Sequence, residues 1–155
     1  MRYWYALCGV AVVAALGGCA GKAPDPTPQA GGVSMPATPP AWHEPTAYAF
    51  TLRSSCGDQR LKGTFRTVVQ NGLVVQDTAL DATARAKVPA GQLSRLVPTL
   101  AQIEATVASA RKQGADEVVV DHDDTDGHPT SVRIDMRKDT RGDESCYDIS
   151  NYSAG

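Results

Sequence analysis

The stretch Phe65–Val75, which reads FRTVVQNGLVV, decides the fold. Apolar and polar side chains alternate before Asn71-Gly72, and a second apolar run follows that dipeptide. Alternation with a period of two is typical of a half-buried strand. A type I′ turn needs positive φ at both central residues, and Asn-Gly adopts that geometry at low cost. The stretch therefore predicts two antiparallel strands joined by a tight turn that fixes their register.

Four further segments predict strands on either side of this hairpin. Tyr48–Leu52 and Val132–Met136 alternate in the same way, whereas Val118–Val120 is a continuous β-branched run. Tyr147–Tyr152 is expected to form a last, short strand.

An apolar stripe predicts one helix. Its members recur at intervals of three and four residues: Leu93, Leu96, Val97, Leu100, Ile103, Val107 and Ala110. Thr99 with Gln102 forms a capping-box pattern, and Gly114 stands where a left-handed C-terminal residue belongs, which predicts a helix over Leu100–Gln113. Glu104 is expected to be exposed beside the stripe.

The segment from Asp77 to Gln92 is expected to be a loop with one helical turn at most, because Asp81 and Pro89-Ala90-Gly91 interrupt its pattern. The predicted fold class is therefore α+β. It is an antiparallel sheet of about five to six strands in the order β-β-β-α-β-β-β, packed on one face by a single helix and formed by residues 46–155.

The N-terminus resembles that of bacterial lipoproteins. Arg2 precedes an apolar run, Tyr3–Leu16, which is too short to cross a membrane as a helix, and the sequence Leu-Gly-Gly-Cys ends at Cys19. The resemblance to a lipobox implies a signal peptide over residues 1–18, lipidation of Cys19 and cleavage before it. Two or more acyl chains anchor a protein stably, so we expect attachment to the extracytoplasmic face of a membrane, with the outer membrane an option in a two-membrane host.

Residues 19–45 are expected to form a tether. They contain seven of the ten prolines among small and polar residues, so they cannot build a core. A fully extended polyproline-like tether would reach about 80 Å, and a coil about 28 Å. At its end, Trp42 and His43 are expected to pack against the first strand.

A second resemblance covers roughly Tyr48 to Asp135. It rests on a helix that ends in Gly114-Ala115-Asp116, a strand with Val118 and Val120, and a turn with Asp123, Gly127 and Pro129 leading into a strand that ends in Ile134-Asp135. These features resemble an uncharacterised family of bacterial secreted proteins and lipoproteins, a domain of unknown function. The resemblance implies export and implies no activity.

Two cysteines remain once Cys8 in the signal peptide and Cys19 are set aside. Cys56 and Cys146 lie in a domain expected to be exported, and paired thiols in an oxidising compartment most simply form a disulfide. There is no Cys-x-x-Cys pair that would favour a redox role.

One acidic segment gathers residue types that ligate metals. The candidates are Asp121, Asp123, Asp124, Asp126 and His128. A calcium-loop alignment fails because Arg133 falls where a bidentate carboxylate belongs. The segment is therefore interpreted either as a solvated turn, stiffened by Pro129, or as a weak site for Ca²⁺ or another metal.

Charge is uneven along the chain. Residues 52–115 carry nine basic and four acidic side chains, and residues 116–148 carry four basic and eleven acidic ones. These charges are expected to pair across the open face of the sheet, or else to steer a basic partner.

Composition and motifs limit the function. The net charge of −2 and the absence of a basic cluster argue against nucleic-acid binding. No Gly-x-Ser-x-Gly, His-Glu-x-x-His, Walker or dinucleotide motif occurs, so neither an enzyme nor a cofactor is expected. We expect a non-enzymatic binding module that contacts another envelope protein or the wall, with a metal-binding domain as the alternative.

Overall fold

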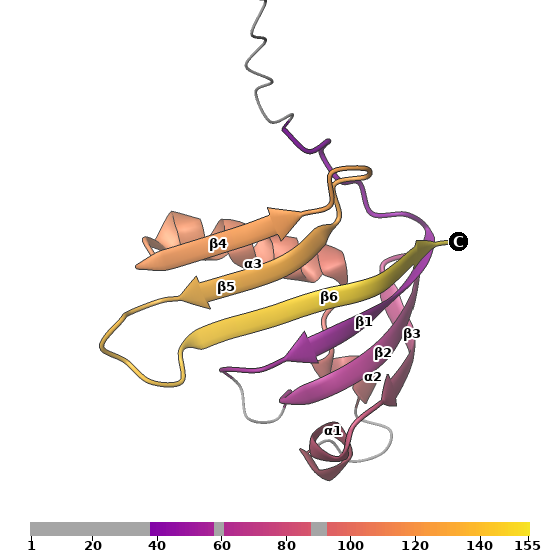
Figure 1. The fold of residues 1–155 in the computed structure, drawn as a ribbon, viewed down its shortest axis with the longest axis horizontal. Helices are drawn as coiled ribbons and strands as arrows, with labels where there is room; N and C mark the ends of the chain where they lie inside the picture. The colour runs from indigo at the N-terminus through magenta and orange to yellow at the C-terminus, as the bar shows by residue number, and fades with distance from the viewer. Residues whose placement is uncertain (1–37, 58–60, 88–92) are drawn as a thin grey trace, which may run out of the picture. The chain divides into compact units, whose positions relative to one another are not determined.

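The computed structural model describes residues 38–57, 61–87 and 93–155. Within these ranges six strands form one antiparallel sheet in the order β3-β2-β1-β6-β5-β4 (Figure 1). The strands are β1 (Ala47–Ser54), β2 (Gly63–Gln70), β3 (Leu73–Ala79), β4 (Glu117–His122), β5 (Pro129–Asp135) and β6 (Glu144–Ala154). The helices are α1 (Ala82–Lys87), α2 (Leu93–Leu96) and α3 (Leu100–Gln113).

The hairpin predicted from the Asn-Gly turn is confirmed. Asn71 and Gly72 have φ of 49° and 73°, the positive values that a type I′ turn requires. Gln70 pairs with Leu73, and a bulge between Val68 and Val69 interrupts the register with β3. Strand β3 is an edge of the sheet, and its Leu73 side chain is 68% exposed.

The last strand, β6, holds the two halves of the sheet together. It pairs with β1 on one side and with β5 on the other, so the hairpins β2-β3 and β4-β5 lie at opposite edges. It has 11 residues, more than any other strand here, where a short strand was expected. The strand that comes last in the chain therefore completes the sheet.

The core lies between one face of the sheet and the helices. Alternate residues of the central strands are fully or nearly fully buried, among them Phe50, Leu52, Phe65, Val69 and Val132. Helix α3 meets them with Leu100, Ile103, Val107 and Ala110. Its predicted bounds and both predicted caps are confirmed, because Thr99 and Gln102 form the capping box and Gly114 has a φ of 73°.

The predicted fold class, α+β with a single helix packed on one face, is wrong. The described residues contain two further short helices, α1 and α2, and strands account for more of them than helices do, so the protein is β-rich. Helix α3 contacts β4 and β5, whereas α1 contacts β2 and β3, and α2 contacts β3. Neighbouring strands lie about 4.8 Å apart, so a sheet of six strands is wider than one helix, whose diameter is about 10 Å. A single helix therefore cannot cover the sheet.

Helix α1 begins where the sequence pattern was expected to break. The Asp81 carboxylate accepts a hydrogen bond of 2.7 Å from the Ala84 amide, which is how an N-cap serves a helix start. This bond lowers the pKa of Asp81. Ala84 is fully buried, and a Cβ on Gly63 would lie 2.6 Å from the Ala84 amide nitrogen, so α1 packs directly on β2. The predicted break at Pro89–Gly91 lies outside the described residues.

The predicted disulfide between Cys56 and Cys146 is present, with a Cα–Cα distance of 5.2 Å. It joins the chain just after β1 to β6, and the Ser55 amide donates a hydrogen bond of 3.1 Å to the Cys146 carbonyl beside it. No helix in the described part of the chain has the length and apolar character needed to cross a bilayer.

Candidate functional site

Residues 38–46, here called the strap, lie across one end of the sheet. The indole of Trp42 meets the Tyr48 ring edge to face with centroids 6.0 Å apart, and its Nε1 donates to the Tyr152 hydroxyl at 3.4 Å. The predicted contact with the first strand is therefore confirmed for Trp42, whereas His43, predicted together with it, is exposed. A Cβ on Gly127 would lie 1.9 Å from the Pro40 carbonyl oxygen, so only glycine lets the strap approach the chain this closely here.

Tyr48 ties the strap to the start of α3. Its hydroxyl donates to Glu44 Oε1 at 2.7 Å and accepts from the Leu100 amide at 3.1 Å. Burial, assisted by the hydrogen bond to Glu44, raises the pKa of Tyr48 above its usual value, so the phenol stays protonated and remains a donor. Glu44 is thereby fixed at the positive end of the helix.

Residues 121–128, here called the acidic turn, join β4 to β5 next to the strap. Asp123 Oδ1 accepts from the Thr125 amide at 2.8 Å and from the Asp126 amide at 3.4 Å. The bond from the Thr125 amide is the main reason that the pKa of Asp123 is lowered. These bonds form an Asx turn, in which a short carboxylate stabilises the backbone bend.

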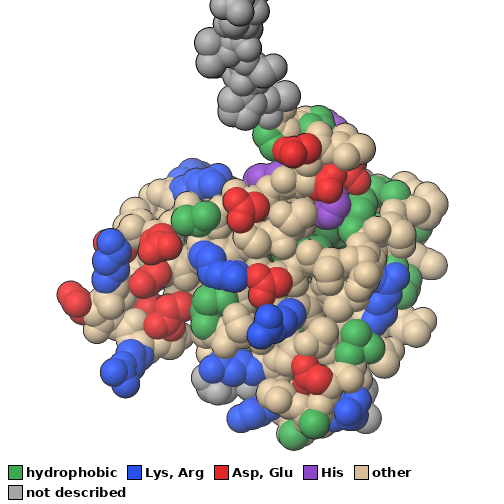
Figure 2. Space-filling model, in the orientation of Figure 1, with side chains coloured by type: hydrophobic (Ala, Val, Ile, Leu, Met, Phe, Trp, Pro, Cys, Tyr) green, Lys and Arg blue, Asp and Glu red, His purple; other side chains and the backbone are tan. Residues whose placement is uncertain are grey.

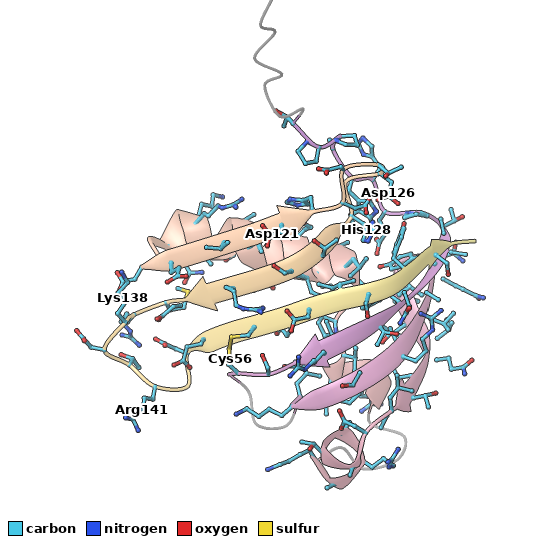
Figure 3. The ribbon with its side chains drawn as sticks, in the orientation of Figure 1. Cys56, Asp121, Asp126, His128, Lys138 and Arg141 are labelled. Carbon is cyan, nitrogen blue, oxygen red and sulfur yellow. A yellow bond between two sulfur atoms is a disulfide. The ribbon has the colours of Figure 1, made fainter. Side chains whose placement is uncertain are left out.

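His128 is held firmly at the exit of this turn. Both its amide and its Nδ1 contact Asp126 Oδ1, and its ring stacks on Tyr152 with centroids 4.1 Å apart. The residue is only 8% exposed. Figure 3 shows Asp126 and His128 together beside the strap, whereas Asp121 lies apart from them over the strands.

Three of the five candidate metal ligands come together. Ligand atoms of Asp123, Asp126 and His128 all lie within 4.8 Å of one another. Asp121 instead accepts a hydrogen bond of 2.7 Å from the Ser131 hydroxyl, and Asp124 is exposed outside the group. Asp123 and Asp126 also accept bonds from the turn, which agrees with the turn interpretation. The metal site stays a prediction.

A cleft of about 350 Å³ lies between the strap and α3. The described residues that line it are Trp42, His43, Glu44, Ala101, Glu104 and His122. Trp42 and His122 also line a neighbouring cleft of about 260 Å³, which reaches Pro40 and Gly127. Figure 2 shows the histidine side chains beside acidic ones at this end, while Lys, Arg, Asp and Glu side chains are mixed over the rest of the face.

Sequence reasoning missed the contact between α3 and β4 in this cleft. His122 Nε2 lies 2.9 Å from Glu104 Oε1, and each side chain is about one third exposed, so Glu104 is not the freely exposed residue expected. Glu104 follows buried Ile103 on the helix, and only the docking of α3 on β4 brings it to His122. The spacing of apolar residues predicts which face of a helix is buried. It does not identify the residue on another strand or helix that a side chain contacts.

Among the described residues, the open face of the sheet carries one charge pair of the predicted kind, between Arg53 and Asp148. Arg133 Nη2 lies 2.8 Å from Asp148 Oδ1, and Arg53 Nη1 lies 4.0 Å from Asp148 Oδ2. The pair between Arg53 and Asp148 joins the basic and the acidic stretch of the sequence. Such exposed pairs contribute well under about 1 kcal/mol each, so they organise the face more than they stabilise the fold.

The chain matches the model of one protein family over residues 41–154, and this family is described as a family of unknown function, DUF6174. The match extends past both ends of the resemblance found over Tyr48 to Asp135. It takes in part of the strap and the cleft residues, and it runs to Ala154, the last residue of β6. No curated protein and no solved structure matches the chain.

Proposed function

Because the chain belongs to the DUF6174 family, for which no function is described, we propose its role from its own residues. The protein is a lipid-anchored binding module of the cell envelope that faces away from the cytoplasm and has no enzymatic activity. Its partners are the membrane, through the lipid on Cys19, and another envelope protein or the wall. Nucleic acid is not among them.

The N-terminal sequence and the disulfide support the location. Leu16-Gly-Gly-Cys19 follows a charged and then an apolar stretch, as in secreted lipoproteins. The bond between Cys56 and Cys146 persists in an oxidising compartment, which agrees with export. Ala20 lacks the acidic character that would favour retention in an inner membrane, so the outer membrane is the proposed site in a two-membrane host.

The observation that carries the binding role is the cleft between the strap and α3. Binding sites are concave and usually preformed, with a few polar groups placed in them. Hydrogen bonds hold Glu44 to Tyr48 and His122 to Glu104, and these bonds preorganise the cleft. A module on a flexible tether gains effective concentration near the membrane without a fixed orientation.

Replacing Cys19 by Ala is expected to abolish lipid attachment, because the thiol that receives the diacylglyceryl group is lost. Cells are labelled with radioactive palmitate and the protein is immunoprecipitated. The wild type and Cys8→Ala, the matched control inside the signal peptide, are expected to incorporate label, whereas Cys19→Ala incorporates none. Equal labelling of Cys19→Ala and Cys8→Ala, or no label in the wild type, would contradict the anchor.

A photo-crosslinking side chain in place of His43 is expected to capture a partner in living cells. His43 is exposed at the cleft, whereas Asp139 is exposed in the β5–β6 loop, whose labelled residues Lys138 and Arg141 lie far from His128 in Figure 3. A discrete product from position 43 and none from position 139 supports binding at the cleft. Products of equal yield from both positions, or none from either, would remove the support for this role.

A further inference from the structure

We propose that the cleft between the strap and α3 binds an alkylammonium group, the protonated primary amine at the end of a small ligand or of a wall peptide. This assignment names a ligand class for the binding role proposed above and rests on it. Three features of the cleft favour this ligand: its charge, the way its carboxylates are held and its aromatic wall.

The charge of the cleft selects a cation. Glu44 on the strap and Glu104 on α3 are acidic side chains, and no Lys or Arg is among the described residues that line the cleft. With histidines counted as neutral, the lining therefore carries a charge of −2. Opposite charges a few ångströms apart attract each other more strongly in a partly enclosed site than in bulk water.

Both carboxylates are oriented before a ligand arrives. Glu44 Oε1 accepts from the Tyr48 hydroxyl at 2.7 Å, and Glu104 Oε1 lies 2.9 Å from His122 Nε2. A carboxylate offers about four lone-pair positions, so each retains capacity for an ammonium donor. Because the side chains are already fixed, binding costs less rotamer entropy than it would with two free glutamates.

The aromatic wall is Trp42. Its indole is fixed by Tyr48 and Tyr152, and it lines both this cleft and the adjoining one. Tryptophan is the aromatic residue that attracts ammonium groups most strongly. The volume of about 350 Å³ accommodates the amine with a short alkyl chain and is too small for a folded partner, so the ligand presents its amine end.

The start of α3 does not make the cleft a site for anions. Helix N-termini attract negative charge, but here two of the first three amides already donate to side chains. The Leu100 amide donates to Tyr48, and the Gln102 amide donates to Thr99. Glu44, held through Tyr48, already supplies the negative charge that this end of the helix favours.

The test uses the full ¹⁵N-labelled chain in detergent, titrated with 1,5-diaminopentane and, separately, with the neutral 1,5-pentanediol. The diamine is expected to give saturable shifts at the amides of His43, Ala101, Glu104 and His122, and the diol none at equal concentration. Glu104→Gln is expected to weaken diamine binding at least about fivefold, because the amide keeps the shape of the side chain but loses its charge and one acceptor oxygen. Glu117→Gln, which neutralises an exposed carboxylate on β4, is the matched control and keeps the wild-type affinity.

The proposal is overturned if the diamine gives no saturable shift, if the diol binds as well, or if Glu104→Gln binds like Glu117→Gln while its spectrum shows an intact fold. If Glu104→Gln does not fold, Glu44→Gln takes its place in the same comparison.

Pelleting with insoluble peptidoglycan then identifies the source of the amine, since N-acetylation of the peptidoglycan removes the charge of its amines. If the protein pellets with peptidoglycan and acetylation abolishes this, the amine belongs to wall peptides. If the protein binds the diamine but does not pellet, the ligand is a soluble amine.

This titration involves neither the lipid anchor nor a cellular partner. A negative titration together with crosslinking at position 43 would refute the ligand class and leave the binding role intact. A positive titration with no crosslink and no lipid label would refute the proposed setting and leave the amine site intact.

Discussion

Replacing Cys56 and Cys146 together by Ala is expected to lower the free energy of unfolding by about 4–5 kcal/mol. The bond closes a loop across a sequence separation of 90 residues, and a loop of that length restricts the unfolded chain by about this amount in the chain-entropy model. It also fastens β6, which joins both halves of the sheet, to the chain after β1. Stability is measured by urea denaturation of the full chain in detergent.

Two comparisons make the disulfide result specific. Reductant is expected to destabilise the wild type as much as the double substitution does, and to have no further effect on the double variant. Cys8→Ala, which lies outside the described residues, is expected to leave the unfolding midpoint unchanged. A loss below about 1 kcal/mol in the double variant would mean that the bond does not constrain the unfolded chain as this model requires.

Replacing Asp77 by Asn is expected to stabilise the protein at pH 7.5 by about 1–2 kcal/mol. Neither carboxylate oxygen of Asp77 has a hydrogen-bond partner among the described residues, and both are shielded from water. Burial raises the pKa of Asp77 to about 6. For a fully buried carboxyl, such a rise in pKa would lower the free energy of unfolding by about 3 kcal/mol. We expect a smaller effect because Asp77 is only half-buried.

The sign of the pH dependence follows from proton binding. The folded state keeps the Asp77 proton up to about pH 6, whereas the unfolded state releases it near 3.8. The contribution of this group to stability is therefore fully present below about pH 4 and is lost as the pH rises to 6. The lowered pKa values of Asp81 and Asp123 act in the opposite sense and below this window.

Urea denaturation at pH 4 to 8 checks this prediction. The wild type should lose stability from pH 4 to 6, and Asp77→Asn should lack that part of the slope. Asp124→Asn, a change at an exposed aspartate, should keep the wild-type profile. An Asn variant that is less stable than the wild type at pH 7.5 would show that the charged form of Asp77 has a favourable partner.

The parts of the fold that the sequence predicted are those that local chemistry determines. The turn at Asn71-Gly72 follows from the φ values that these residues tolerate, and the bounds of α3 follow from Thr99 and Gly114. The disulfide followed from counting cysteines in a chain that was expected to be exported. Each inference needed only neighbouring residues or a count.

The parts that the sequence did not predict depend on contacts between distant segments. The sequence predicts a last, short strand at Tyr147–Tyr152, but it does not place that strand between β1 and β5. Asp81 breaks an apolar pattern and caps a helix at the same time, and only the packing of Ala84 on β2 distinguishes the two roles. In the same way, Glu104 and His122 meet through the docking of a helix, which no spacing reveals.

The start of β1 and the C-terminus lie side by side. The Gly155 amide donates a hydrogen bond of 2.9 Å to the Ala47 carbonyl, and Figure 1 shows the C-terminus beside the start of β1. A short linker can therefore join these ends, and a circular permutant can open the chain in the exposed β5–β6 loop instead. A reporter fused after Gly155 would crowd the strap, whereas the β5–β6 loop offers an insertion point at the opposite end of the sheet.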